Sequence, residues 1–340
     1  MSLAGRLRKA QMSAAVAELL GAQNVYIGAH IAPDGDAVGS MLGLGAAMRR
    51  LGKTCTLACA DPIPLKFDFL AGMRDVAAEP PMAEEVIVCV DCSDAERLGS
   101  LYQEDIFQSR PVINIDHHVT NTGYGSINLV QFLPSTAEIV LSVVKQLGVG
   151  VDKEIASALL TGLVTDTRCF RTGNVTQRQL SVAMELMRAG ASLSEITELV
   201  FSRDPFAAVC LWGQSLASVQ RRGSIIWAEI SQDMIRKCQA SPNDDNGLVS
   251  FLAGKEGVDV AIVFRETDDG RIDASMRSGP RLDISGAAKK LGGGGHPRAA
   301  GCTVAGSMEA VRNAVLVEVE GALGEQRASL GNAAESRAQH

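Results

Sequence analysis

The stretch PVINIDHH, residues 111–118, is an apolar run that ends in one carboxylate and two imidazoles. A continuous apolar run of this length is typical of a strand buried on both faces of a parallel sheet. The chain has 5 histidines, and two of them stand side by side here. Adjacent histidines at a strand end have no common structural role. The stretch therefore predicts a buried strand and a functional site at its end.

The neighbouring segments extend this pattern into an α/β domain. Further short apolar strands are predicted over 24–30, 53–59 and 84–91. Helices are predicted over 36–51, 135–148 and 175–191, and the stretch 152–167 reads as a helix that runs into a loop. Buried strands that alternate with helices indicate a parallel sheet flanked by helices. The N-terminal segment, residues 1–23, reads as an amphipathic helix and lacks the apolar core of a secretory signal.

The pattern changes after about residue 200. Strands are predicted over 224–231, 258–267 and 271–278, with the turn TDDGR closing a hairpin between the last two. We therefore expect a smaller C-terminal mixed-sheet α/β domain, with the active site in the cleft between the two domains. The expected division is a catalytic domain over 1–195, a linker over 196–215, a second domain over 216–325 and a disordered tail over 326–340.

Composition limits the classes of function. A length of 340 residues suits two domains, and no apolar run is long enough to cross a membrane. The formal net charge of -7 argues against a protein that coats long nucleic acid, but it allows a short anionic substrate. Cys89 and Cys92 have the spacing of a metal or redox motif, yet they lie in or beside an apolar run. We interpret the 8 cysteines as reduced, mostly buried thiols of a cytoplasmic protein.

Acidic and imidazole side chains follow several of the predicted strands and one helix. Taken singly, most of them could be helix caps. In an open α/β sheet, however, the carboxyl ends of the strands meet at one edge, where ligands bind. Crowded carboxylates raise one another's pKa or bind a cation, and oxygen mixed with imidazole suits Mn(II), with Mg(II) or Co(II) as alternatives. There are enough ligands for two ions, which predicts phosphoester or phosphoanhydride hydrolysis. The side chains concerned are His30, Asp34, Asp36, Asp91, Asp116, His117, His118 and Asp166.

These motifs resemble the DHH phosphoesterase superfamily. The resemblance rests on the segments HIAPDGDAVGS at 30–40, VDCSD at 90–94, DHH at 116–118 and TDT at 165–167. GGGGHPRAAG at 292–301 is similar to a motif of the DHH-associated C-terminal domain. The length, without additional modules, most resembles the nanoRNase branch, whose members are bifunctional oligoribonucleases and 3′-phosphoadenosine 5′-phosphate phosphatases.

The resemblance implies roles for individual residues. His30 and Asp34 would hold one metal ion, Asp36, His117 and Asp166 would hold the other, and Asp91 would bridge the two, with a metal-bridging water as nucleophile. His118 would assist at the scissile phosphate as an acid or as a phosphate ligand. Asp116 would orient His117, because metal-bound histidines usually need such a partner.

The C-terminal domain would bind the substrate. The glycine run, including Gly294 and Gly295, would let bare backbone N–H groups approach a phosphate, although a glycine run is more often only a flexible turn. By resemblance, Arg277 and Ser278 would grip the substrate phosphate or base. His296 and Arg298 would add charge, and a merely solvated role for Arg298 is an equal alternative. Arg168 stands where relatives carry glycine, and its role is left open.

The predicted function is metal-dependent cleavage of short single-stranded RNA, about two to five nucleotides long by family analogy, to mononucleotides. Removal of the 3′-phosphate of 3′-phosphoadenosine 5′-phosphate is a second expected activity. The alternatives are a cyclic or linear dinucleotide phosphodiesterase of the same superfamily and a non-catalytic nucleotide sensor. A pyrophosphatase, a long-substrate exonuclease and a structural zinc protein are less favoured. No membrane partner is expected, and a homodimer is one candidate for the oligomeric state.

Overall fold

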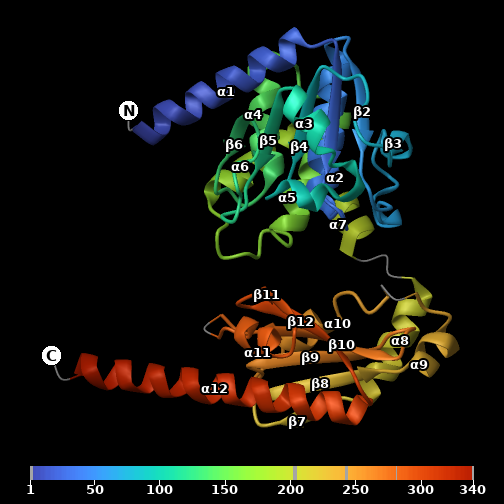
Figure 1. Ribbon diagram of the computed structural model, residues 1–340, viewed down its shortest axis with the longest axis vertical. Helices are drawn as coiled ribbons and strands as arrows, with labels where there is room; N and C mark the ends of the chain where they lie inside the picture. The colour runs from blue at the N-terminus through green and yellow to red at the C-terminus, as the bar shows by residue number, and fades with distance from the viewer. Residues whose placement is uncertain (1–2, 202–204, 242–243, 281, 339–340) are drawn as a thin grey trace. The chain divides into compact units, whose positions relative to one another are not determined.

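The computed structural model describes residues 3–201, 205–241, 244–280 and 282–338. The chain folds as two compact units that divide after residue 203 (Figure 1). The range 196–215, expected to be a linker, contains the end of helix α7 (Leu193–Phe201) and most of helix α8 (Phe206–Ala217). Residues 202–204 of that range lie outside the described residues.

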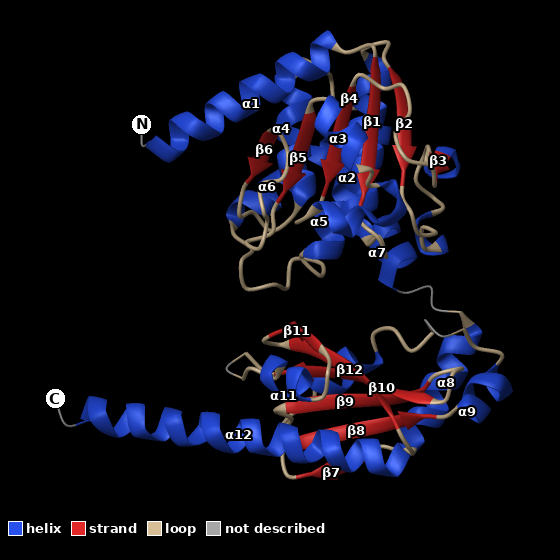
Figure 2. Cartoon of the chain, viewed as in Figure 1, coloured by secondary structure: helices blue, strands red, loops and turns tan. Residues whose placement is uncertain are grey.

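The first unit is built on a six-stranded sheet, seen in Figure 2, in which every pair of neighbouring strands is parallel. The strand order is β3-β2-β1-β4-β5-β6. This confirms the parallel-sheet domain that the apolar runs predicted. The order reverses between β1 and β4, so a ligand is expected outside the carboxyl ends of those two strands. The strands are β1 (Asn24–Ala29), β2 (Thr54–Ala58), β3 (Val76–Ala77), β4 (Val86–Val90), β5 (Val112–Asp116) and β6 (Ile127–Val130).

Helices and 3₁₀ turns fill the connections of this unit. Strands β1, β4 and β5 are buried along almost their whole length, which is why they read as continuous apolar runs. The helical elements are α1 (Leu3–Gly21), α2 (Gly35–Arg50), η1 (Leu65–Phe67), η2 (Met73–Asp75), η3 (Ala95–Leu101), α3 (Glu104–Ser109), α4 (Thr136–Gln146), α5 (Lys153–Asp166), α6 (Gln177–Arg188) and α7.

Helices α2 and α5 cross at very short range. A Cβ atom at Gly39 would lie 2.3 Å from the carbonyl oxygen of Ala158, and one at Gly162 would lie 2.7 Å from Oδ1 of Asp36. Only glycine leaves room for this approach. The close crossing brings Asp36, at the start of α2, near Asp166, at the end of α5.

The second unit holds a six-stranded sheet in the order β11-β12-β10-β9-β8-β7. The sheet is mixed, as the sequence predicted for this domain. Strands β9 and β10 form the antiparallel hairpin closed by the turn at 267–270. Its strands are β7 (Gln220–Arg222), β8 (Ile225–Ile230), β9 (Val260–Glu266), β10 (Arg271–Ser278), β11 (Gly294–His296) and β12 (Ala299–Ala305). Its helices are α8, α9 (Gln232–Cys238), α10 (Leu248–Ala253), α11 (Ser285–Lys290) and α12 (Met308–Ala338). Helix α12 therefore runs through most of the range 326–340, where a disordered tail was expected.

The prediction that all cysteines are reduced is wrong for one pair. Cys210 on α8 and Cys238 on α9 form a disulfide, whereas the other six cysteines are free thiols. Cys89 and Cys92 are fully buried, as predicted. Among the described residues, no cysteine belongs to a group that could hold a metal ion, which removes the structural zinc alternative for that part of the chain. No described helix is long and apolar enough to span a membrane.

Candidate metal centre

The strand order explains why residues far apart in the sequence meet. Ala29 at the end of β1 pairs with Val90 at the end of β4, so the next residues, His30 and Asp91, leave the sheet side by side. Strand β5 pairs with β4 on its other side. Its last residue, Asp116, is followed directly by His117. Three neighbouring strands thus deliver imidazoles and carboxylates to one edge.

Three groups of side chains lie close enough to hold a metal ion. They are His30 with Asp34 and Asp91, Asp36 with His117 and Asp166, and Asp91 with His117 and His118. Asp91 belongs to two of them through different oxygens. Its Oδ2 lies 3.6 Å from Nε2 of His30, and its Oδ1 lies 3.5 Å from Nε2 of His117. Two donors on one ion, each at about 2.1 Å, lie about 3–4 Å apart, so this spacing fits divalent cations.

Backbone carbonyls orient two of the histidines. Nδ1 of His30 lies 2.7 Å from the carbonyl oxygen of Ile31, and Nδ1 of His117 lies 2.9 Å from that of Leu133. A carbonyl oxygen only accepts, so in each ring Nδ1 carries the hydrogen. The Nε2 atoms that face the carboxylates are then free to bind a metal.

The prediction that Asp116 orients His117 is wrong, because Asp116 contacts the other histidine. Asp116 Oδ1 lies 2.8 Å from Nδ1 of His118, not of His117. The other oxygen of Asp116 accepts from Nδ2 of Asn121 at 2.6 Å. Because Asp116 is fully buried and faces His118, it orients the second histidine, while the Leu133 carbonyl orients the first.

The start of helix α4 supports two carboxylates, which the sequence did not indicate. The backbone N–H groups of Thr136 and Ala137 donate to the two oxygens of Asp36 at 2.5 and 3.0 Å. The Thr136 hydroxyl donates to Oδ1 of Asp91 at 2.8 Å. Thr136 thus connects the two ligand groups. The only sequence signal was its position at the first turn of a helix.

Electrostatic effects differ across the cluster. Burial raises the pKa of Asp36 well above its ordinary value, and the charges of Asp91 and Asp166 add to the effect. Burial also raises the pKa of Asp166, to about 6, against the opposing charge of His117. Two carboxyl groups are therefore disfavoured as anions unless a cation compensates them, which is the behaviour expected of a metal site.

The pKa of Asp91 shifts in the opposite sense, while the pKa of His118 is raised. Burial acts to raise the pKa of Asp91, but the His30 ring 3.6 Å away and the charge of His117 outweigh it, and the pKa is lowered. The hydrogen bond to Asp116 raises the pKa of His118, despite partial burial. The anionic form of Asp91 is thus favoured between the histidines, whereas His118 keeps its proton to a higher pH than a free histidine.

Asp34 is both a helix cap and a candidate metal ligand. Its Oδ1 accepts from the backbone N–H groups of Asp36 and Ala37 and so caps helix α2. The same atom lies 4.0 Å from Nε2 of His30. Its side chain is 57% exposed, far more than that of Asp91. The helix-cap interpretation and the ligand interpretation therefore both apply to this residue.

The C-terminal residues predicted to bind substrate gather at one end of the second sheet. Arg277 on β10 pairs with Ala299 on β12, which in turn pairs with His296 on β11. Ser278 is buried, and its hydroxyl donates to the Leu282 carbonyl at 2.7 Å, a structural bond. His296 and Arg298 are exposed.

The glycine run is explained largely by strand packing. A Cβ at Gly293 would lie 2.1 Å from the carbonyl oxygen of Gly301, and Gly295 has a φ of +133° with its Cβ position 2.5 Å from the Ala299 carbonyl. These two glycines let β11 lie against β12. A Cβ atom at Gly294 would meet no other atom within 4 Å, so the glycine there is not required by packing.

Arg168 ends helix α5 in a strained conformation. Cys169 N–H donates to the Val164 carbonyl and Arg168 N–H to that of Thr165, the pattern of a Schellman motif. Arg168, with a φ of 47°, occupies the position where glycine is usual. Arg168 therefore stands at the C-terminal cap of α5, and the next two residues, Cys169 and Phe170, also have positive φ.

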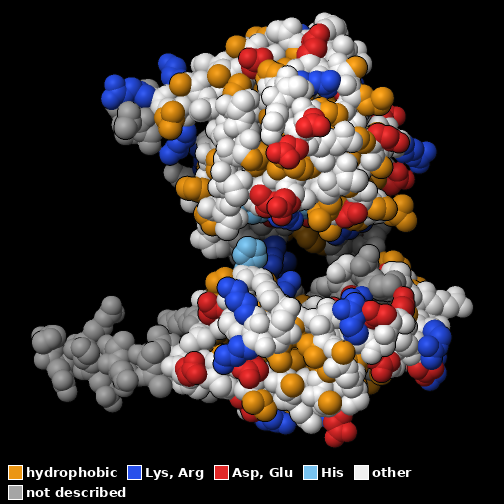
Figure 3. Space-filling view, viewed as in Figure 1, with side chains coloured by type: hydrophobic (Ala, Val, Ile, Leu, Met, Phe, Trp, Pro, Cys, Tyr) orange, Lys and Arg blue, Asp and Glu red, His pale blue; other side chains and the backbone are white. Residues whose placement is uncertain are grey.

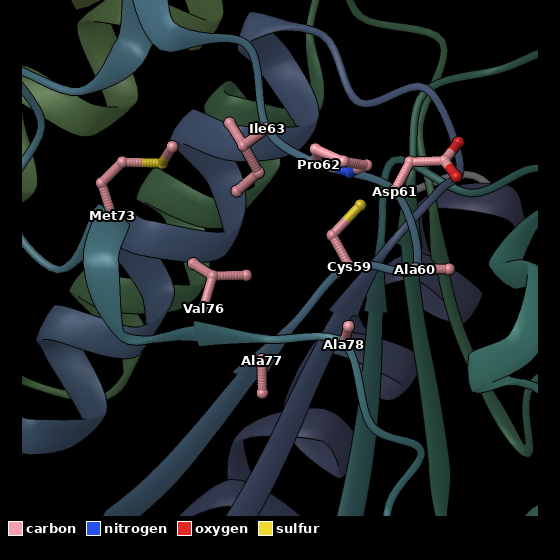
Figure 4. Close-up of a pocket in the computed structure, with 9 residues that line it drawn as sticks. All are labelled: Cys59, Ala60, Asp61, Pro62, Ile63, Met73, Val76, Ala77 and Ala78. Carbon is pink, nitrogen blue, oxygen red and sulfur yellow. The ribbon is translucent and has the colours of Figure 1, made fainter.

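A cavity of about 270 Å³ lies beyond the carboxyl ends of β2 and β3 (Figure 4). It is lined by residues 59–63, Met73 and residues 76–78. The Cys59 thiol donates to the His30 carbonyl at 3.3 Å, which connects this cavity to the loop after β1. The cavity shares the functional edge of the sheet but contains none of the predicted ligands.

The described surface in Figure 3 carries acidic side chains scattered over the visible face of the first unit, and Lys and Arg interspersed with Asp and Glu on that of the second. Mixed charge of this kind agrees with a short anionic ligand better than with a long nucleic acid.

Comparisons with known proteins agree with this geometry. Residues 24–163 match the DHH family, N-terminal domain, and residues 232–325 match the DHHA1 domain. A Thermus thermophilus protein named bifunctional oligoribonuclease and PAP phosphatase NrnA is 36% identical over 302 residues, covering 86% of this chain and 88% of the relative.

Two solved structures share the fold. An exopolyphosphatase-related protein from Bacteroides fragilis has a TM-score of 0.88 at 22% identity, covering 94% of this chain and 98% of that chain. RecJ from Thermus thermophilus, solved in complex with Mn²⁺, has a TM-score of 0.54 at 17% identity, and the match covers 93% of this chain and 54% of that chain.

Proposed function

This chain belongs to the DHH family, and on that premise we propose that it is a metal-dependent phosphodiesterase that degrades short oligoribonucleotides to mononucleotides. We propose the removal of the 3′-phosphate from 3′-phosphoadenosine 5′-phosphate as its second activity. The relative from Thermus thermophilus, which is named for both activities, supports this pairing.

The observation that carries the proposal is the position of Asp91. Its two oxygens face His30 and His117, which belong to separate ligand groups. A shared carboxylate between two such groups suits a pair of divalent ions, of which Mn(II) fits the mixture of oxygen and imidazole donors. One group is His30, Asp34 and Asp91, and the other is Asp36, His117 and Asp166.

Bound divalent ions would supply a nucleophilic water at neutral pH and would neutralise charge on the phosphoryl oxygens. The protein's own residues then have separate tasks. His118, held by Asp116 through Nδ1, keeps a proton on Nε2 for the departing oxygen or for a phosphate oxygen. Thr136, whose hydroxyl donates to Asp91, would keep that carboxylate in place between the two ligand groups.

The second unit is proposed to bind the substrate. Arg277 and Arg298 provide positive charge, His296 a further polar group, and Gly294 a backbone without a side chain. Ser278 is assigned a supporting role, because its hydroxyl already donates to the Leu282 carbonyl. Recognition of a terminal phosphate by this unit would favour short substrates. The homodimeric state and the cytoplasmic location remain predictions.

The deciding experiment is hydrolysis of 5′-labelled RNAs two, three, five and twenty-four nucleotides long, with Mn(II) and with EDTA. 3′-Phosphoadenosine 5′-phosphate, pApA and cyclic di-AMP complete the substrate panel. We expect Mn-dependent loss of the short RNAs while the long one is spared. Activity confined to cyclic di-AMP or pApA would replace the proposed substrate with the dinucleotide alternative.

The bridging role of Asp91 has its own test. Asp91→Asn keeps the shape of the side chain and removes its charge, and Asp75→Asn, at an exposed position, is the matched control. We expect hydrolysis to fall at least about a hundredfold in the first variant and to persist in the second. A wild-type protein that binds nucleotides but cleaves none of the panel would establish the sensor alternative.

A further inference from the structure

Arg97 is held between two loops of the candidate metal centre, the loop after β1 and the loop after β4. Asp94 caps the 3₁₀ helix η3 by accepting from the Arg97 backbone N–H at 3.0 Å. The Arg97 carbonyl accepts from the backbone N–H of Ile31 at 2.8 Å. The backbone of Arg97 is therefore tied to the segment after β4, which carries Asp91, and to the segment after β1, which carries His30.

The Arg97 side chain points to the same place. Its Nη2 atom lies 3.4 Å from Nδ1 of His30, and the residue is half-buried. Its positive charge also lies within electrostatic range of His118. The guanidinium thus stands beside the His30 imidazole and acts electrostatically on that of His118.

The contact with His30 does not satisfy the Nη2 donor of Arg97. Nδ1 of His30 lies 2.7 Å from the Ile31 carbonyl and must carry its hydrogen there. Two donors then face each other, so Nη2 of Arg97 has no acceptor in that ring.

Arg97 also lacks an ion pair. Within the described residues, no Asp or Glu lies at ion-pair distance from the Arg97 guanidinium. Arg312 shows the usual arrangement, since it is also half-buried but lies 2.7 Å from Glu229. A partly buried guanidinium without a partner costs free energy. A phosphate suits it, because two of the phosphate oxygens can accept from the planar fork of guanidinium N–H groups.

We propose that the Arg97 guanidinium binds a phosphate group of the substrate beside the metal centre. The inference rests on the proposed function and deepens it, because it assigns a phosphate-binding residue to the first unit in addition to those proposed in the second. The ligand class is a nucleotide whose phosphate offers two oxygens to the fork of N–H donors. The hydrogen bonds to Asp94 and Ile31 hold the residue in place before the ligand arrives.

The test measures binding of AMP, a mononucleotide product, by calorimetry on the Mn(II)-loaded full-length protein. Adenosine serves as the ligand without phosphate. Arg97→Met removes the charge at similar length, and Arg97→Lys keeps the charge but removes the fork. Arg74→Met is the matched control, because Arg74 is 86% exposed and pairs with Asp68.

We expect the affinity for AMP to fall about tenfold to a hundredfold in Arg97→Met, and less in Arg97→Lys. Adenosine binding and the affinity for Mn(II) should not change, nor should AMP binding in Arg74→Met. Unchanged AMP affinity in Arg97→Met would overturn the proposal. A parallel loss of Mn(II) affinity would also overturn it, since Arg97 would then only position His30.

Two further results keep the inference separate from the proposed function. If Arg97→Met does not fold, as judged by circular dichroism, AMP binding is measured on Arg97→Lys and Arg97→Gln instead. A wild-type protein that cleaves no RNA, but whose AMP binding depends on Arg97, would reject the proposed activity and retain the phosphate site.

Discussion

Nδ1 of His118 lies 2.8 Å from Oδ1 of Asp116, two residues earlier in the chain. The two imidazoles of the DHH motif therefore have different supports, a carboxylate for His118 and the Leu133 carbonyl for His117. A carboxylate partner stabilises a protonated ring, whereas a carbonyl fixes a neutral tautomer. We therefore expect His118 to hold a proton and His117 to bind metal.

Removal of the carboxylate should change the pH dependence of the reaction. The hydrogen bond to Asp116 raises the pKa of His118, so the imidazole stays protonated to a higher pH than a free histidine. In Asp116→Asn we expect kcat to fall about tenfold and its alkaline limb to move to lower pH by about one unit. A pH profile of kcat with Mn(II) checks this, and an unmoved alkaline limb would show that His118 is not the titrating acid.

A double variant tests whether Asp116 acts only through His118. His118→Asn should lower kcat at least as much as Asp116→Asn, and the double variant should be little worse than His118→Asn alone, because Asp116 acts through His118. Multiplicative losses would instead give Asp116 an independent role.

The metal-free protein should lose stability as the pH rises. The pKa of Asp166 is raised from 3.8 to about 6 in the folded state, so its contribution is fully present below 3.8 and is lost as the pH rises through about 6. We expect a loss of about 1–2 kcal/mol in the free energy of unfolding in EDTA between pH 4 and pH 7 from this group.

Divalent metal should reverse that dependence. Because Asp166 must be deprotonated to bind a cation, stabilisation by Mn(II) should be larger at pH 7.5 than at pH 5. Thermal melting with EDTA and with Mn(II) at both pH values measures this, and Asp166→Asn should weaken both effects. Equal stabilisation at the two pH values would argue against Asp166 as a ligand.

Thr136 should matter for metal affinity. In Thr136→Val the hydrogen bond to Asp91 is lost, and we expect the affinity for Mn(II) to fall about tenfold, with recovery in Thr136→Ser. Thr161→Val is the matched control, because Thr161 is equally buried but donates only to the Ser157 carbonyl within its own helix. Equal effects of the two valine variants in a Mn(II) titration would reduce Thr136 to a packing residue.

Arg168→Gly should stabilise the fold. Arg168 occupies a left-handed position that glycine adopts without a steric penalty, so we expect a gain of about 0.5–1 kcal/mol in the free energy of unfolding. Urea denaturation measures the gain. An unchanged kcat/KM on short RNA would identify Arg168 as a capping residue, whereas a raised KM would show that its side chain contacts substrate.

The sequence predicted the long buried strands well and the marginal ones poorly. Strands β1, β4 and β5 are continuous apolar runs because both faces are covered, and a run of that kind is visible without coordinates. The strands β3, with two residues, and β6, which is half-buried, were not predicted, since neither has a distinct periodic pattern. The disulfide between Cys210 and Cys238 was also not visible, because pairing depends on the packing of α8 against α9.

What the sequence by itself determined is the set of side chains at the functional edge. Parallel strands all end at the same edge, so acidic and imidazole residues that follow buried runs, such as His30, Asp91 and His117, must come together there. Only the tertiary structure decided how each is held. Adjacent residues after a strand point in different directions, and their partners, the Leu133 carbonyl, Thr136 and Arg97, come from segments whose approach is set by packing rather than by local sequence.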